Sequence, residues 1–470
     1  MASASRQLIR QVLNAYNSEF ESSVVNHAKS LLLDTLGVSL AAREAPEALR
    51  LRKALQNSGG LTSAGSGAIL WGSQNTASCG DAALYNGTLA HALELDDFGG
   101  ADHSGAVVFP AVLAVSELPL NLSGLEFLKA AIAGYEVARR VLEAAGAYRI
   151  HNADAGWHST ATCGAPGAAV AAGLVLGLDE DQLVSALGFA TTMIGGTWAF
   201  NSDGAMSKRL HPGWAANLGV NASLWAQAGI TGPEFAFEAD WGGFFNTYAK
   251  EGAEPQKLHE NFWVWPRVLR SGVKPYPCCR DNHSVVDIML DLHSEVQGQL
   301  SNVKRIEIRC IPEMYKMLSN ATPKNMVEAQ LSMPYSSAVA LVDGKVTLDR
   351  FANEALADPT VRRIIEKIEM TSDASLEDDA EPLVLVHMND GTTNERTIPF
   401  AKGDHKNPLG TEEIEAKFFD MCRIGGIGNS AKEIVEVVDR IETAESIRPL
   451  LDLLEAPTQE TSNGAPGKAA

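Results

Sequence analysis

Hydrophobic residues recur every three or four positions over most of the first 260 residues, the spacing of amphipathic helices. In residues 4–20, Ile9, Val12 and Tyr16 fall on one face of a predicted helix. Alanine and glycine dominate the run that ends at Gly177, which indicates a helix buried closely among others. Helices are predicted over 4–20, 22–42, 46–56, 77–95, 106–118, 123–145 and 179–193, and a short strand over 68–71.

The pattern changes after about residue 262. Residues 304–310 alternate with a period of two and predict a strand. Two further β segments, 383–387 and 393–398, flank Asn389-Asp-Gly391, which is a hairpin signal. Helical patterns at 283–300, 329–341 and 359–369 lie between these strands, and helices return at 411–422, 430–438 and 444–454.

These patterns predict a mainly α protein with a large all-helical domain and a smaller α+β domain. The helical domain covers residues 1–265 and is completed by the C-terminal helices within 410–455. The α+β domain covers 266–405. Residues 456–470 are small and polar and predict a disordered tail.

A basic stretch, Gly204–Gly213, places Lys208, Arg209 and His211 within four residues. Pro212 is predicted to open a helix, because proline suits a first helical turn. Free backbone N–H groups there would add positive character beside Lys208. The stretch therefore predicts a site for a small anion with more than one carboxylate. The alternative is an ordinary basic turn on the surface, and the stretch alone leaves both open.

Two histidine-containing segments are further candidates. The predicted helix 77–95 runs into Glu94-Leu-Asp-Asp97, and His103 follows closely. An acidic, glycine-containing loop can also be merely flexible. His158 stands at the start of the small-residue helix, where hydrogen-bonded core histidines are common as well as catalytic ones.

Charge and cysteine usage narrow the function classes. With 38 basic and 58 acidic residues the net charge is −20, which argues against nucleic acid or an anionic membrane as a partner. The sequence has no apolar run long enough for a transmembrane helix, and we expect a reduced, cytoplasmic setting. The six cysteines show no zinc-type spacing, and no metal or cofactor motif is recognised.

Short motifs between about residues 30 and 420 follow one another in an order that carries a resemblance. They are Leu33–Gly37, His91–Asp97, His103 with the next few residues, Gly156–His158, Gly204–Gly213, Lys274–Cys279 leading to His283, and Gly403–Gly410. Each motif alone is weak, whereas the ordered set strongly resembles the MmgE/PrpD family. That family includes 2-methylcitrate dehydratase, cis-aconitate decarboxylase and iminodisuccinate epimerase.

The resemblance implies that the α+β domain is a lid, that the active site lies between the two domains and that the protein is a homodimer. It also implies that no metal or organic cofactor is needed. The family's catalytic positions carry over to Glu94 or Asp97, His103, His158 and Lys208, with another in the Cys278–His283 stretch. Three departures are a glutamate at 94 where relatives often have aspartate, a shorter 97–103 loop, and Cys279 where some members have histidine.

The family's reactions create carbanion character beside a carboxylate, which calls for cations and for groups that titrate near neutrality. We expect Lys208 to hold a substrate carboxylate, His103 and His158 to move protons, and Asp97 to orient a histidine. The catalytic residues predicted in this way are Asp97, His103, His158 and Lys208, and the substrate-binding residues are Glu94, Arg209, His211, Lys274, Cys279 and His283.

The leading hypothesis is a cofactor-independent lyase that decarboxylates or dehydrates a citrate- or aconitate-like polycarboxylic acid. An isomerase that removes and returns an α-proton of a dicarboxylic acid is the second hypothesis. The third is a catalytically silent dimeric binding protein. Decarboxylation, dehydration and epimerisation are all left open by the sequence, as is the substrate's side chain.

Overall fold

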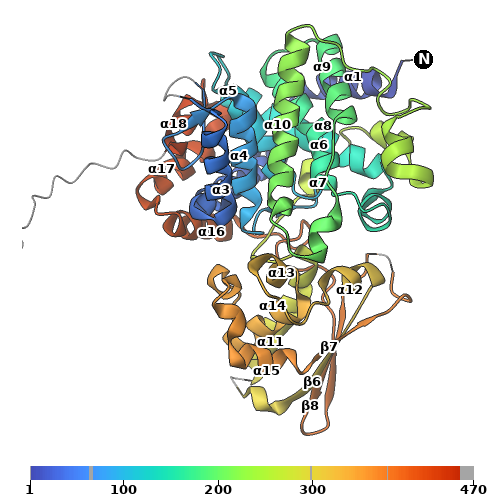
Figure 1. The fold of residues 1–470 in the computed structure, drawn as a ribbon, viewed down its shortest axis with the longest axis vertical. Coiled ribbons are helices and arrows are strands. Elements are labelled where there is room, and N and C mark those ends of the chain that lie inside the picture. Colours follow the sequence, from blue (N-terminus) through green and yellow to red (C-terminus); the bar gives the residue numbers. More distant parts are fainter. Residues whose placement is uncertain (1, 63–66, 297–298, 378, 456–470) are drawn as a thin grey trace, which may run out of the picture.

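The computed structural model describes residues 2–62, 67–296, 299–377 and 379–455, and these residues form a helical body joined to a smaller part that holds a β-sheet (Figure 1). The predicted tail, 456–470, lies outside the described residues. The helices of the body are α1 (Ala4–Tyr16), α2 (Ser22–Ala41), α3 (Pro46–Asn57), α4 (Cys79–Ala92), α5 (Gly105–Ser116), α6 (Gly124–Ala144), α7 (Ser159–Thr162), α8 (Gly164–Val175), α9 (Glu180–Thr192) and α10 (Ser207–Gln227).

In the helical body, the observed helix starts agree closely with the predicted ones where a polar residue caps the helix. Ser123 and Glu126 form a capping box at the start of α6, and Asp179 and Gln182 form another at α9. The predicted strand at 68–71 is the two-residue strand β2 (Ala68–Ile69) between β1 (Leu61–Thr62) and β3 (Thr76–Ala77), with the order β1-β3-β2. The mainly helical fold predicted from the sequence is confirmed.

Two glycines set the approach of the antiparallel helices α4 and α10. A methyl group on Gly87 would lie 2.7 Å from the Cα of Gly213, and one on Gly213 would lie 2.1 Å from the carbonyl oxygen of Leu84. Such contacts require the backbones to move apart. The absence of side chains at Gly87 and Gly213 therefore lets the end of α4 meet the start of α10.

The start of α10 differs from the prediction. The helix begins at Ser207, so that Pro212 lies inside it and Lys208 and Arg209 lie in its first turn. Pro212 has no backbone N–H and cannot donate a hydrogen bond to the carbonyl of Lys208. The helix nevertheless extends over residues 208–211 toward its N-terminus. Lys208 and Arg209 therefore belong to the first turn of α10 and not to a loop before it.

The smaller part is an α+β unit. Its sheet has the order β7-β6-β8-β9, with β6 (Val303–Cys310) parallel to β7 (Ile368–Ser372) and antiparallel to β8 (Leu383–Met388), which pairs with β9 (Thr393–Arg396). The predicted hairpin is present, and Gly391 takes a φ of 91° in its turn. The helices are α11 (His283–Val296), α12 (Pro312–Leu318), α13 (Met326–Gln330), α14 (Met333–Asp343) and α15 (Pro359–Ile365).

The last helices return to the body: α16 (Thr411–Ile424), α17 (Gly428–Asp439) and α18 (Arg448–Leu454). Phe418 of α16, which belongs to the hydrophobic core of the body, packs on the buried Gly37 of α2. A second core lies in the α+β unit and also includes Phe200 from the body. The core of the body also includes Val268 and Val273, and the division into 1–265 with 410–455 and 266–405 stays a prediction.

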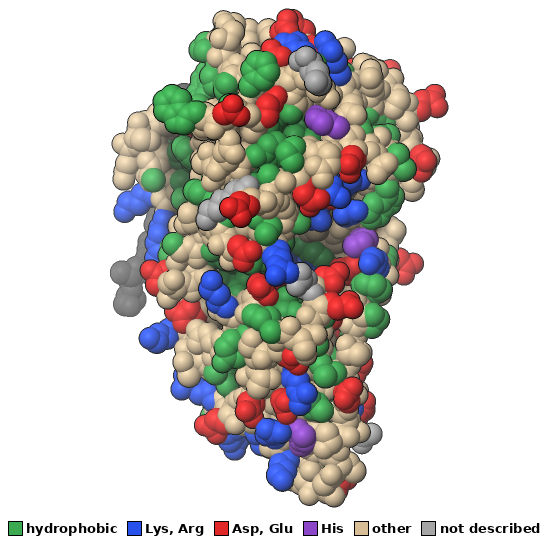
Figure 2. Space-filling model, turned by 90° about the vertical axis from the view of Figure 1, so that its right-hand side faces the viewer, with side chains coloured by type: hydrophobic (Ala, Val, Ile, Leu, Met, Phe, Trp, Pro, Cys, Tyr) green, Lys and Arg blue, Asp and Glu red, His purple; other side chains and the backbone are tan. Residues whose placement is uncertain are grey.

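Within the described residues, no helix is both long enough and apolar enough to cross a membrane. Acidic and basic side chains are interspersed over the face of the molecule that Figure 2 shows, in both the helical body and the α+β unit.

Replacing Gly213 by alanine is expected to lower the free energy of unfolding by about 1–3 kcal/mol, because the added methyl group overpacks the α4–α10 contact. Urea denaturation measures the change. Gly428→Ala is the matched control, since a methyl group there meets nothing within 4 Å and alanine favours a helix more than glycine does. Equal stability of the two variants would contradict the assigned packing.

Candidate active site

A single buried carboxylate, that of Glu94, gathers three cations from separate segments. Lys208 and Arg209 of α10 both donate to its Oε2, and the Nζ atom of Lys274 lies 3.0 Å from its Oε1. Lys274 directly follows the strand β5 (Gly272–Val273), which pairs with β4 (Asp97–Phe98). The basic stretch and the acidic helix end predicted from the sequence are thus in direct contact. We call these four residues the Glu94 cluster.

The charges of the Glu94 cluster reinforce one another. Burial alone would raise the pKa of Glu94, but the two lysines and Arg209 hold that pKa well below its usual value. Burial lowers the pKa of Lys208, and the charge of Glu94 opposes this effect. One carboxylate against three cations leaves positive charge in excess, which favours an additional anion.

The α+β unit reaches the same cluster through Gln330, the last residue of α13. Its Oε1 accepts a hydrogen bond of 2.6 Å from Arg209, and its Nε2 donates to the carbonyl of Leu93 at 2.9 Å. The Gln330 backbone carbonyl accepts from the N–H of Cys279 at 2.9 Å. Gln330 therefore connects both domains at the cations, and α13 lies where the two parts meet (Figure 1).

The carboxylate that orients a histidine is Asp96 rather than Asp97. Asp96 Oδ2 lies 2.9 Å from the Nδ1 of His91 and 3.2 Å from the Nδ1 of His103. These two imidazoles are in contact, with ring centroids 4.3 Å apart. The Nδ1 of His103 also lies 3.0 Å from the carbonyl oxygen of Asp97. The Nε2 of His103 is left to face Asp102 at 3.6 Å.

Asp97 turns its carboxylate away from the imidazoles. It accepts hydrogen bonds from the N–H of Gly105 at 3.0 Å and from the hydroxyl of Tyr135 at 2.9 Å. Burial and the neighbouring charge of Asp96 raise the pKa of Asp97 to about 7. The expectation that the Asp97 carboxylate orients a histidine is thus corrected, because this carboxylate binds Gly105 and Tyr135 while that of Asp96 contacts the imidazoles.

The two imidazoles expected to move protons have opposite electrostatic surroundings. Burial opposes ionisation of His103, yet the charges of Asp96 and Asp102 raise its pKa above the usual value. Burial, with His211 and Lys208 nearby, lowers the pKa of His158 well below the usual value. These shifts favour protonation of His103 over protonation of His158.

His158 is held by partners on both sides. Its Nδ1 lies 2.9 Å from the Nδ1 of His211, and its Nε2 lies 3.3 Å from the hydroxyl of Thr160. The rings of Trp198 and Phe200 pack edge-on against it, with centroids 5.2 and 5.5 Å away. Burial lowers the pKa of His211 to about 4. A neutral His211 thus positions His158, while its own contact with a substrate stays a prediction.

Of the other predicted binding residues, Lys274 joins the Glu94 cluster, whereas no hydrogen bond joins Cys279 or His283 to Glu94 within the part of the chain that the structure describes. The pKa of the Cys279 thiol is raised by burial. The Nε2 of His283 lies 3.3 Å from the Cys278 carbonyl, and its ring packs against those of Tyr276 and Phe98. Roles for Cys279 and His283 in substrate binding stay predictions.

A metal ion has one conceivable set of ligands among the described residues. His91, Glu94 and His103 each offer an atom within 4.8 Å of the others. However, Glu94 already accepts from Lys208, Arg209 and Lys274. A divalent cation would have to displace these groups and stand against their charge, so the residue set suits an anion better.

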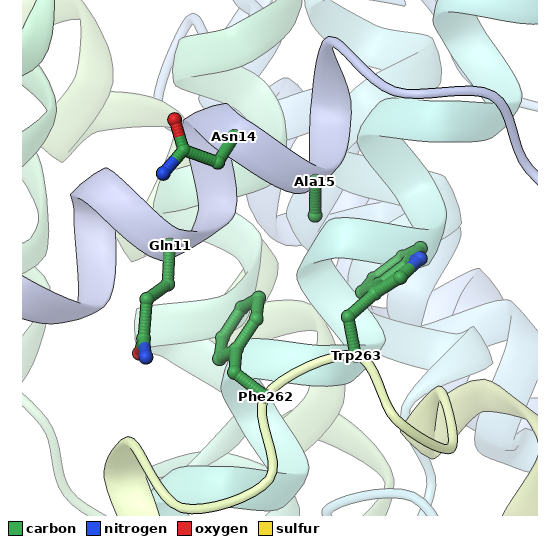
Figure 3. A pocket seen from close by; sticks show the side chains of 5 residues that line it. All are labelled: Gln11, Asn14, Ala15, Phe262 and Trp263. Atoms are coloured by element: carbon green, nitrogen blue, oxygen red, sulfur yellow. The ribbon is translucent and has the colours of Figure 1, made fainter.

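A separate surface pocket, between α1 and residues 262–263, is lined by Gln11, Asn14, Ala15, Phe262 and Trp263 (Figure 3). These five side chains are uncharged, and none of them is suited to proton transfer near neutral pH. This pocket therefore offers no group for the proton transfers that the sequence leads us to expect.

The sequence reasoning missed several residues that contact the predicted ones, among them Asp96, Asp102 and Gln330. Asp96 is part of the motif His91–Asp97, but the sequence does not reveal whether the carboxylate of Asp96 or that of Asp97 faces the imidazoles. Asp102 directly precedes His103, and its proximity to His158 depends on a left-handed backbone, with φ at 75°. Gln330 carries no signal in the sequence, because its contact with Arg209 spans 121 positions.

Comparisons with known proteins agree with this architecture. The MmgE/PrpD N-terminal domain matches residues 6–256, and the MmgE/PrpD C-terminal domain matches residues 276–443. The chain is 28% identical to a cis-aconitate decarboxylase of Aspergillus terreus over 95% of this chain and 94% of that protein. It is 25% identical to the cis-aconitate decarboxylase of Homo sapiens, over 94% of this chain and 93% of that protein.

It is also 28% identical to a cis-aconitate decarboxylase-like protein, oryM, of Aspergillus oryzae, over 95% of this chain and 96% of that protein. The two domain matches together cover most of the chain, in the order in which its motifs occur. The resemblance inferred from those motifs is therefore confirmed, and the chain belongs to the MmgE/PrpD family.

Proposed function

We propose that the protein is a cofactor-independent lyase that decarboxylates a cis-aconitate-like polycarboxylic acid. The observation that carries the proposal is the excess positive charge of Lys208, Arg209 and Lys274 around Glu94, beside two imidazoles whose pKa values are shifted in opposite directions. The names of its relatives in Aspergillus terreus and Homo sapiens support decarboxylation over dehydration.

In this proposal the cations hold carboxylates of the substrate that do not react. The carbon–carbon bond to another carboxylate breaks, carbon dioxide leaves, and the electron pair delocalises over the adjacent double bond. Neighbouring cations stabilise this charge as it develops. The cationic His103 then donates its proton from Nε2 to carbon, and solvent returns a proton to His103.

Asp96 keeps the imidazole of His103 in place for this transfer. It contacts Nδ1, so that Nε2 faces the reacting carbon. Its charge also favours the protonated ring that a proton donor requires. Asp96 thus acts through His103 and is a positioning residue.

One observation favours an isomerase as the second candidate. The Nε2 atoms of His103 and His158 both face the carboxylate of Asp102, at 3.6 and 3.7 Å. One cationic and one neutral imidazole on two sides of a bound acid are suited to returning and removing an α-proton. Such a reaction exchanges protons with solvent and releases no carbon dioxide.

Incubation with cis-aconitate, citrate and alkylcitrates in D₂O separates these reactions. We expect carbon dioxide release from cis-aconitate together with one deuterium in the product, followed by NMR and mass spectrometry. An alkene formed from citrate without carbon dioxide would instead indicate dehydration. Deuterium exchange without loss of mass would indicate the isomerase. Tight binding with neither turnover nor exchange would favour a silent binding protein.

Lys208→Ala is expected to reduce turnover of cis-aconitate by a hundredfold or more, on the order seen when one stabilising group is removed from an active site. The fold should persist, because Arg209 and Lys274 still neutralise Glu94. Circular dichroism and steady-state kinetics measure both quantities. Lys432→Ala, at a side chain 82% exposed, is the control. Near-normal turnover by Lys208→Ala would contradict the role of Lys208 in holding a carboxylate.

Asp96→Asn is expected to move the alkaline limb of the kcat/KM profile down by about one pH unit or more, the usual effect of losing an adjacent opposite charge. The sign follows because Asp96 raises the pKa of His103, whose protonated form donates the proton. Asp420→Asn, at an exposed surface carboxylate, should leave the limb in place. An unmoved or upward-shifted limb in Asp96→Asn would show that His103 is not the acid.

A further inference from the structure

Asp102 lies between the two imidazoles that the proposed reaction uses. Its Oδ1 is 3.6 Å from the Nε2 of His103, and its Oδ2 is 3.7 Å from the Nε2 of His158. Both distances exceed those of a normal hydrogen bond, so neither ring fixes the carboxylate in place. One side chain thus faces both imidazoles.

The ring nitrogens that face Asp102 are the Nε2 atoms of His103 and His158. On His103, Nδ1 is already taken by Asp96 and by the carbonyl of Asp97. On His158, Nδ1 is taken by His211, and Nε2 also lies 3.3 Å from the hydroxyl of Thr160. Any acid that exchanges a proton with either Nε2 must therefore approach the place that the Asp102 carboxylate holds.

The backbone and the exposure of Asp102 allow its side chain to leave this place. The residue has a φ of 75°, in the left-handed region that aspartate, asparagine and glycine tolerate best. Its side chain is 21% exposed, whereas those of His103 and His158 are 6% and 0% exposed. Asp102 is thus the member of this group that has contact with solvent.

Asp102 also faces the α+β unit. Burial, together with the charges of Glu381 and Asp102, raises the pKa of Asp281 to about 6 against the opposing effect of Arg280. Asp281 stands next to Arg280 in the segment that precedes α11. The charge of Asp102 therefore acts on a residue of the α+β unit.

We propose that Asp102 is a specificity-determining residue whose carboxylate takes the position that one carboxylate of the substrate occupies between His103 and His158. This inference rests on the proposed function, because it assumes a polycarboxylate substrate. The substrate carboxylate exchanges with Asp102 at the imidazoles, while the cations of the Glu94 cluster hold the others. Like charges cannot share the position, so Asp102 weakens binding of acids that carry a carboxylate there.

Removing the charge of Asp102 should strengthen the binding of tricarballylate, a saturated tricarboxylate that cannot undergo the proposed reaction. We expect its Kd, measured by calorimetry at pH 6, to fall about tenfold in Asp102→Asn. Asparagine tolerates the left-handed backbone, and Asp102→Gly is a second variant that tolerates it equally well. Asp154→Asn removes the same charge from an exposed residue and should change Kd less than twofold.

The imidazole NMR signals of His103 and His158 locate the ligand. Both should shift as tricarballylate saturates the wild type and Asp102→Asn. Unchanged or weaker binding by both Asp102 variants would overturn the inference, as would binding that leaves both imidazole signals in place. An equal gain in Asp154→Asn would also overturn it, because the effect would then be one of net charge.

Turnover of cis-aconitate by the wild type tests the proposed function separately. Turnover without an affinity gain in the Asp102 variants would overturn only the inference about Asp102. The affinity gain without turnover would support the position of Asp102 and reject the lyase. Failure of every form to bind tricarballylate would overturn both.

Discussion

The buried Glu94 carboxylate is the constraint on which the site depends. Three cations removed from water are costly unless they are neutralised, and Glu94 provides the neutralising charge to all three. Taking Glu94 away would leave Lys208, Arg209 and Lys274 facing one another. Because one carboxylate offsets only one charge, the same group that stabilises the cations preserves their attraction for further carboxylates.

The fold supplies the means of holding that cluster together. Gly87 and Gly213 let α4 and α10 cross closely, so that Glu94 meets the first turn of α10. Lys417 of α16 forms an ion pair with Asp34, with 2.5 Å between Nζ and Oδ1, and donates a hydrogen bond of 2.6 Å to the carbonyl oxygen of Leu95. The C-terminal helices therefore support the segment that carries Glu94, although they lie more than 300 positions away in sequence.

Much of the fold could be predicted from the sequence, because helical periodicity and polar caps are local signals. The alternation along Val303–Cys310 and the turn at Gly391 likewise identified strands of the α+β unit. Pro212 misled the prediction of where α10 begins, since a proline within a helix resembles one at its first turn. The family resemblance, carried by ordered motifs, supplied the domain arrangement that local patterns alone leave open.

The charged residues of the site could be predicted from the sequence, whereas most of the contacts that these residues make could not. Lys208, Arg209 and Lys274 were identified as cations, but only the fold shows that they share Glu94. Which of two adjacent aspartates faces His103 depends on backbone direction, which no composition rule gives. Gln330 joins the site through long-range packing of one domain against the other.

The most direct measurement is a crystal structure with tricarballylate bound. The account predicts one ligand carboxylate within hydrogen-bond distance of Lys208, Arg209 or Lys274 and another between His103 and His158. A ligand bound away from both places, for instance in the pocket beside Trp263 (Figure 3), would contradict it.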